Sequence, residues 1–218
     1  MMNDNSKIRL AGLNDIDFIV EAIIEAEKSG TDHCGFSTSF GLSEEETKSY
    51  LRGMLEEEID GCEFSLDSFL IYEIDGTPVA AVAGWIEGDN SSDQPSSILK
   101  SNLIGYYLPK KNIEVAASLS QYINDLQIER TKGTLQIEYV YCRADYRGKG
   151  ITKSLIQSHI NKFNVEFAEV QVFGNNENAM ALYQKLGFIV KSESVSNLPD
   201  IIDYFPSNKK ILFNKKIN

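Results

Sequence analysis

The sequence contains few residues of the types that cross-link a chain or bind metals. Its 218 residues include three cysteines and two histidines, and the cysteines, Cys34, Cys62 and Cys142, lie far apart. A structural zinc site needs closely spaced pairs of ligands, and a disulfide framework needs more cysteines in a regular arrangement. We therefore expect three reduced thiols and no metal.

Long apolar runs are also missing. No window holds the roughly 18 uninterrupted apolar residues of a membrane-spanning helix. The first residues, MMNDNS, lack the basic and then apolar profile of a signal peptide. We expect a cytoplasmic protein with no membrane contact. With 42% hydrophobic and 24% charged residues, the chain has the composition of a globular protein that needs no cross-link to fold.

Acidic residues outnumber basic ones, most strongly in the first third of the chain. The formal charge is −11, and residues 1–75 hold 18 acidic residues against 5 basic ones. A nucleic-acid-binding protein needs a broad basic surface to contact many phosphates, so we expect no nucleic-acid partner. The exception is a basic island formed by Arg143, Arg147, Lys149 and Lys153, which suits a small phosphorylated ligand better.

Helical and extended patterns alternate along the chain. Apolar spacings of three and four residues predict helices capped by Asn14-Asp15 and by Ser43, and helical segments over residues 96–108, 112–130, 148–163 and 176–186. Alternation predicts strands over residues 7–11, 69–74, 78–86, 134–142, 168–173, 188–192 and 210–217, whereas residues 30–41 are expected to form a loop. Neither a repeat nor a flexible linker divides the chain, so one α/β domain over residues 1–218 is predicted.

The strand over residues 134–142 has the most regular pattern. Its strict alternation predicts two distinct faces. The residues expected on one face are Leu135, Ile137, Tyr139 and Tyr141, and those expected on the other are Gln136, Glu138, Val140 and Cys142.

The segment after this strand carries an anion-binding pattern. Gly148 and Gly150 accompany a predicted helix start, which leaves about four N–H groups unpaired and carries roughly half a positive charge. Glycines allow an anion close to the backbone, and Arg147, Lys149 and Lys153 add positive charge. The pattern favours a phosphate or pyrophosphate, with a plain tight turn as the alternative. The Walker and dinucleotide-binding glycine motifs are both absent.

A second cluster follows the next predicted strand. It reads NNENAMALYQKLGF over residues 175–188, and together with YRGKGI over residues 146–151 it resembles the GNAT superfamily of acyl-CoA N-acyltransferases. The resemblance covers about residues 134–192. It implies a mixed, mostly antiparallel central sheet flanked by helices, and transfer of an acetyl group from acetyl-CoA to a primary amine by direct attack in a ternary complex.

The resemblance also implies which residues bind acetyl-CoA. The amides that would hold its pyrophosphate are those of Gly148, Lys149, Gly150, Ile151, Thr152 and Lys153. Arg147 begins the family's Arg-x-x-Gly-x-Gly/Ala signature, in which Thr152 replaces the last small residue. The backbone that would pair with the pantetheine arm is that of Val140, Tyr141 and Cys142, and one N–H there would polarise the thioester carbonyl. Asn176 would contact the coenzyme from the second helix start.

Two residues are catalytic candidates. Tyr183 matches the family's general acid, which protonates the departing thiolate. Glu138 is a candidate general base, because several family members place a glutamate on this strand. The alternatives are a core role for Tyr183, a solvated or paired Glu138 with water accepting the proton, and a helix-capping role for Asn176. Cys142 has no paired base, so a covalent acyl-enzyme is not expected.

The sequence says less about the acceptor substrate than about acetyl-CoA. In this family the first helices and their loop bind it, and here that region is acidic and its loop contains His33, Phe36 and Phe40. We expect a small-molecule or peptide amine of cationic character, unless the glutamates at 44–46 and 56–58 are only solvated helix faces.

Residues 88–133 lie where many relatives have a short turn. This expected insertion would cover the acceptor pocket, form a homodimer contact or simply elaborate the surface. The second class of function is a non-catalytic coenzyme A-binding protein with a regulatory or scaffold role, because Thr152 and the undefined base leave room for lost chemistry.

Overall fold

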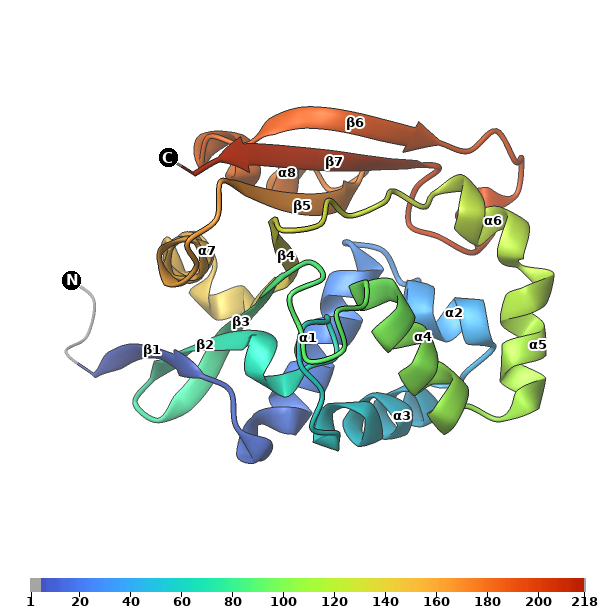
Figure 1. Ribbon diagram of the computed structural model, residues 1–218, viewed down its shortest axis with the longest axis horizontal. Coiled ribbons are helices and arrows are strands. Elements are labelled where there is room, and N and C mark those ends of the chain that lie inside the picture. Colours follow the sequence, from blue (N-terminus) through green and yellow to red (C-terminus); the bar gives the residue numbers. More distant parts are fainter. Residues whose placement is uncertain (1–4, 218) are drawn as a thin grey trace.

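A computed structural model describes residues 5–217 and shows a seven-stranded sheet in the order β1-β2-β3-β4-β5-β7-β6. The strands are β1 (Ser6–Leu10), β2 (Phe69–Ile74), β3 (Thr77–Ile86), β4 (Leu135–Cys142), β5 (Phe167–Phe173), β6 (Ile189–Val195) and β7 (Lys209–Lys216). Only β4 and β5 pair in parallel. The mixed, mostly antiparallel sheet expected from the resemblance is confirmed. In Figure 1, β5, β7 and β6 lie together at the top, β1 to β3 at lower left, and β4 between them.

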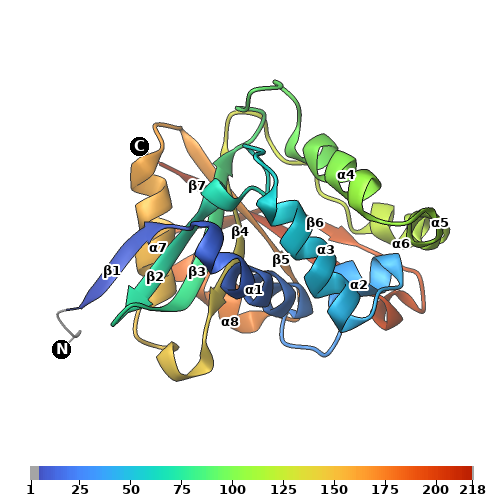
Figure 2. The ribbon, with the colours of Figure 1, turned by 90° about the horizontal axis from the view of Figure 1, so that it is seen from below.

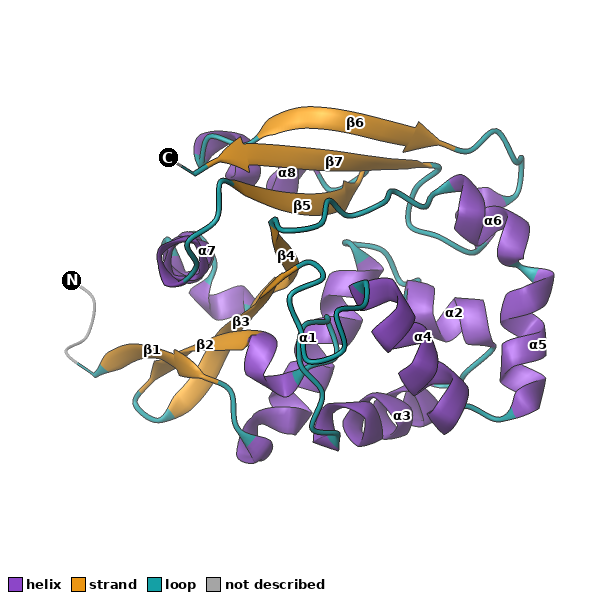
Figure 3. Ribbon diagram, viewed as in Figure 1, coloured by secondary structure: helices purple, strands orange, loops and turns teal. Residues whose placement is uncertain are grey.

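Helices cover both faces of this sheet (Figure 3). They are α1 (Ile16–Lys28), α2 (Gly35–Phe40), α3 (Glu44–Glu56), α4 (Ser96–Tyr107), α5 (Lys110–Ser118), α6 (Ser120–Asp125), α7 (Ile151–Lys162) and α8 (Glu177–Lys185). Figure 2 shows β2 and β3 between α7 on one side and α1 on the other, and each of these helices packs on one of two apolar cores. No helix within residues 5–217 has both the length and the apolar character needed to cross a membrane.

Two predicted helix starts have different outcomes. At α3 the capping box is confirmed, because Ser43 Oγ accepts a hydrogen bond from the Glu46 amide at 3.3 Å and the Glu46 carboxylate accepts one from the Ser43 amide at 2.9 Å. At α1 the prediction was wrong in detail. The Asp15 carboxylate does not cap the helix but accepts hydrogen bonds from the Gly12 amide at 2.9 Å and from Arg9 at 2.7 Å.

Three other segments also differ from the prediction. The expected loop over residues 30–41 contains the short helix α2, because Phe36 turns inward onto the core. The helical pattern over residues 112–130 breaks at Leu119 and ends at Asp125, since Leu119 and Leu126 are buried from two separate short helices. Helix α7 begins at Ile151 and not at 148, because positive φ angles at Gly148 and Gly150 are incompatible with a right-handed helix.

Residues 88–133 form α4, α5 and α6. In Figure 1, α4 lies beside α3, and α5 and α6 follow the right side of the molecule up toward β6 and β7. Helix α6 is attached to the segment between β6 and β7. Tyr122 donates a hydrogen bond to Asp200 at 2.7 Å, and Asp125 accepts one from Ser196 at 2.7 Å. The segment is therefore fixed at both ends of the molecule and forms one wall of it.

The strand β4 departs from strict alternation at Tyr139. Glu138 lies opposite Ala83 and Tyr141 opposite Ala81, so Tyr139 and Val140 together face a single residue of β3. Such a bulge, with Tyr139 at a φ of +49°, turns the side chains after it by one position. The prediction that Leu135, Ile137, Tyr139 and Tyr141 share a face was therefore wrong. The first two belong to the α7-side core and the two tyrosines to the α1-side core.

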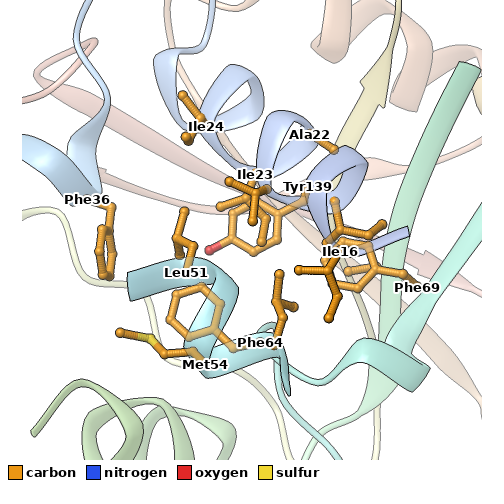
Figure 4. Close-up of a cluster of buried hydrophobic side chains, with 14 of the residues drawn as sticks. Ile16, Ala22, Ile23, Ile24, Phe36, Leu51, Met54, Phe64, Phe69 and Tyr139 are labelled. Atoms are coloured by element: carbon orange, nitrogen blue, oxygen red, sulfur yellow. The ribbon is translucent and has the colours of Figure 1, made fainter. Parts of the chain in front are cut away.

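Packing of the Tyr139 ring accounts for this backbone conformation. The ring lies between those of Phe64 and Phe69, parallel to both within 5°, with centroids 6.4 Å away from each. Figure 4 shows it inside the cluster made by α1, α3 and β2. A left-handed non-glycine residue costs about 1 kcal/mol or more, which burial of a whole aromatic side chain offsets.

The histidine on α7 is a neutral core residue. His159 is fully buried, and its Nε2 lies 2.9 Å from the Val82 carbonyl oxygen. Because a carbonyl can only accept, Nε2 carries the proton, while Nδ1 has no partner within residues 5–217. Burial lowers the pKa of His159 to about 4. A Cβ at Gly84 would lie 2.6 Å from Nδ1, so only glycine fits on β3 at this point.

Because His159 is buried as a neutral residue, the free energy of unfolding should depend on pH in a way that can be tested. The unfolded chain binds a proton near pH 6.5 and the folded one only near pH 4, so stability is lost as the pH falls through this window. The loss is about 2 kcal/mol by pH 4.5. His159→Gln keeps a donor for the Val82 carbonyl but does not titrate. Urea unfolding at about pH 7 and pH 4.5 is expected to show a smaller loss for the variant, and equal losses would contradict the assignment.

Candidate functional site

The sheet opens between β4 and β5. These two strands pair only from Leu135 to Ile137, opposite Ala168 to Val170. Beyond that point β5 pairs with β7 alone, up to Phe173. A cleft of about 1640 Å³ lies between the diverging strands, and it is lined by residues of α1, α4, β4, β5, α8 and the loop before α7. The cleft therefore brings together both motifs found in the sequence.

The open edge of β4 carries unpaired backbone groups. The Arg143 amide donates to the Val79 carbonyl of β3 at 2.9 Å, so by alternation Tyr141 also faces β3, whereas Val140 and Cys142 face the cleft. On the cleft side Arg147 Nε donates to the Cys142 carbonyl at 2.9 Å. An extended ligand with amide groups can add to such an edge as a further strand.

The loop before α7 is a set of free amides. Among the described residues, no acceptor binds the N–H groups of residues 148–153. Gly148 and Gly150 have φ angles of +75° and +79°, and a Cβ at either would find open space. These groups and the N-terminal end of α7 form an anion-binding geometry that fits a pyrophosphate.

The side chains of this loop have different surroundings. Arg147, Thr152 and Lys153 line the cleft together with the two glycines. Ile151 is buried in the α7-side core, so only its amide is available. The Lys149 ammonium lies 4.9 Å above the Tyr146 ring and away from the cleft lining. The replacement at Thr152 therefore leaves a half-buried hydroxyl at the wall of the cleft.

Asn176 has the capping role that was the alternative to coenzyme contact. Its Oδ1 accepts from the Ala179 amide at 3.1 Å, and its Nδ2 donates to Ser29 Oγ at 3.1 Å. Both polar atoms are thus engaged, although the residue lines the cleft. The bond to Ser29 fixes the start of α8 to the end of α1, across the floor of the site.

Tyr183 lies at the cleft with its ring packed and its hydroxyl free. The residue is only 4% exposed, and its ring contacts Phe188 and Phe213 at centroid distances of 6.0 and 6.1 Å. The hydroxyl makes no hydrogen bond to any residue between 5 and 217. Burial, and then the nearby Glu138 charge, raise the pKa of Tyr183. The phenol is therefore protonated at every physiological pH.

Glu138 belongs to a partly buried ionic cluster, which we define as Glu63, Lys100, Arg130 and Glu138. Arg130 Nη2 lies 2.8 Å from Glu138 Oε1 and 3.1 Å from Glu63 Oε1, and Lys100 Nζ lies 3.0 Å from the same Glu63 oxygen. Glu63 is 1% exposed, and burial would raise its pKa. The charges of Arg130 and Lys100 outweigh this effect and hold the pKa at about 2.

Glu27 of α1 is a cleft residue that the sequence reasoning missed. Its Oε1 is 3.4 Å from the Tyr139 hydroxyl, and burial raises its pKa. A signal for it exists in the sequence, because Val20, Ile23 and Glu27 follow the apolar spacing of α1 and place an acid on the buried face. Lys100, Arg130 and Lys210 also line the cleft, and no local pattern marks them.

The remaining residues that the sequence singled out differ in whether they line the cleft. The acids at 44–46 and 56–58 do not line the cleft, and Glu44 is paired with Lys48 at 2.6 Å. Phe36 and Phe40 line it and His33 does not. Burial raises the pKa of the Cys142 thiol, which leaves it protonated and unsuited to nucleophilic attack. Within residues 5–217, no three side chains of His, Cys, Asp or Glu gather as a metal-binding group.

Comparison with known proteins shows the family of the chain. The sequence model of the acetyltransferase (GNAT) family matches residues 38–188, so the chain belongs to this family. None of the curated proteins searched matches the sequence.

Solved structures share the fold at low identity. An N-acetyltransferase from Staphylococcus aureus Mu50 superposes with a TM-score of 0.67 at 17% identity, over 96% of this chain and 100% of that one. The ribosomal-protein-S18-alanine N-acetyltransferase from Escherichia coli gives 0.51 at 13% identity, over 98% and 94% of the two chains. The Salmonella typhimurium protein yncA, solved with its cofactor acetyl-CoA, gives 0.51 at 13%, over 99% and 95%.

The ionic cluster makes a stability prediction. Arg130→Met removes the guanidinium from two carboxylates, one of them fully buried, so we expect the free energy of unfolding to fall by about 3 kcal/mol. The matched control is Lys132→Met, whose partner Asp93 is exposed and whose loss is expected to cost less than about 1 kcal/mol. Chemical denaturation of both variants tests this, and equal small losses would contradict a structural role for the cluster.

Proposed function

We propose that the protein is an acetyl-CoA-dependent N-acetyltransferase that acts on a primary amine. The observation that supports this most is that one cleft holds two sets of backbone groups, the open edge of β4 at Val140 and Cys142 and the free amides of residues 148–153. A pantetheine arm matches the first set and a pyrophosphate the second. Both belong to coenzyme A, and the family membership agrees.

The chain's own groups have distinct roles in this proposal. Acetyl-CoA, when bound, supplies a thioester whose acetyl carbon accepts the amine. A cleft-facing amide of β4 at the Tyr139 bulge donates to the carbonyl oxygen, which gains negative charge as the amine attacks. The new N–C bond forms and the C–S bond breaks. Tyr183 gives its proton to the departing sulfur, and its place deep in the cleft suits this donor role.

Glu138 is the proposed acceptor of the amine proton. Its Oε1 is bound by Arg130, while Oε2 makes no hydrogen bond within the described part of the chain and is available on the cleft side. Arg130 thus orients the carboxylate, and the proton reaches it directly or through water. Cys142 takes no part, because the attack is direct.

A thiol-release assay tests the function. The purified protein is incubated with acetyl-CoA and a panel of amines, and free thiol is measured against a no-amine control. Amine-dependent release supports the proposal. Binding of coenzyme A with no release for any amine would instead favour the non-catalytic regulatory or scaffold protein of the same fold.

Tyr183→Phe tests the proton donor. The change removes one oxygen and keeps the ring contacts with Phe188 and Phe213, so we expect kcat to fall by about 100-fold with an unchanged Kd for coenzyme A. Tyr106→Phe is the control, because Tyr106 is 78% exposed and lies outside the cleft lining. A kcat for Tyr183→Phe within twofold of the parent would rule out this role for the phenol.

A further inference from the structure

Lys210 is a cleft-lining cation that lies near the charges of Glu138 and Glu27 but pairs directly with neither. It is the second residue of β7, and its ammonium lies 5.7 Å from the Phe173 ring. It forms no ion pair with any residue that the structure describes. Its neighbour Lys209 is paired with Glu193 at 2.7 Å, so carboxylates are within reach of this strand. Burial lowers the pKa of Lys210, which shows that its charge is partly withdrawn from water.

Glu27 is a second charged residue of the cleft lining, and its charge is opposite to that of Lys210. It makes no ion pair within residues 5–217, and its one hydrogen bond, from the Tyr139 hydroxyl, is long at 3.4 Å. The carboxylate is packed against the start of α2, because a Cβ at Gly35 would lie 2.9 Å from Glu27 Oε2. The side chain is thus held at the cleft wall, where Lys100 and Lys210 are near it but no described basic side chain forms an ion pair with it.

The charges of the ionic cluster are compensated within the cluster. Glu63 is paired with Lys100 and Arg130, and Glu138 with Arg130. Glu27 and Lys210 influence each other's pKa in the direction expected of opposite charges, yet they do not form an ion pair. An unpaired charge in a partly buried place costs free energy. Two such charges of opposite sign in one cleft indicate a ligand that carries both complements.

We propose that the acceptor is zwitterionic, a free amino acid whose ammonium meets Glu27 and whose carboxylate meets Lys210. This rests on the proposed function and narrows its substrate class. A polyamine or an amino sugar offers cationic groups alone and would leave Lys210 facing positive charge. In the transfer, the ammonium first gives one proton to water, and the free amine then attacks the acetyl carbon and loses a second proton to Glu138 as the C–S bond breaks. The coenzyme leaves as the thiol with the proton of Tyr183, and the proton on Glu138 returns to Tyr183 through water.

Matched substrate pairs test the proposal. Alanine and ethylamine, phenylalanine and phenethylamine, and lysine and cadaverine differ by the carboxylate alone. For at least one pair we expect kcat/KM to be at least about tenfold higher for the amino acid, since a charge-assisted hydrogen bond contributes that factor. Lys210→Met is expected to remove most of this preference, Lys210→Arg to retain part of it, and Lys209→Met to leave it unchanged.

The outcomes separate the two proposals. If acetyl-CoA is not consumed with any amine of either kind, the transferase function fails and the acceptor class with it. If the decarboxylated amines or spermidine are acetylated as well as the amino acids, and Lys210→Met does not alter the ratio, the function stands and the zwitterionic acceptor is wrong. Far-ultraviolet circular dichroism and the melting temperature of each variant confirm that the fold is intact, so that a lost ratio reports recognition.

Discussion

The separation of β4 from β5 is the constraint on which the site depends. Inside a sheet, every backbone group of a central strand is normally paired on both sides. Here pairing with β5 ends at Ile137, directly before the bulge at Tyr139. A bulge bends its strand and increases the local twist. The buried Tyr139 ring holds this bend in place from the α1-side core. The bulge therefore contributes both to the packing of the hydrophobic core and to the open edge of β4.

The charge distribution follows from the same opening. At one end of the cleft, free amides and the side chains of Arg147 and Lys153 make an electropositive rim in a protein whose formal charge is −11. At the other end, the ionic cluster around Arg130 fixes Glu138, while Glu27 and Lys210 remain unpaired. In the proposed reaction, an anionic coenzyme and a small charged acceptor would be drawn to opposite ends, with Tyr183 along the wall of the same cleft.

What the sequence could predict was mostly local. The strands β2 and β3, the Ser43 cap of α3 and the glycine loop before α7 are set by neighbouring residues, and all were found in the structure. The bulge was not predictable from alternation, because it depends on Phe64 and Phe69, which are distant in sequence from Tyr139. Arg130 and Lys210 likewise become site residues only when the chain folds. Glu27 is the exception, since an acid on the apolar stripe of α1 was visible beforehand.

Amide chemical shifts under titration with coenzyme A test the central claim most directly. On a ¹⁵N-labelled sample, the account predicts saturable shifts that are largest for residues 148–153, with Gly148 and Gly150 prominent, and further shifts at Val140 and Cys142 on the open edge of β4. Shifts confined to other parts of the chain, or no saturable change at all, would contradict it.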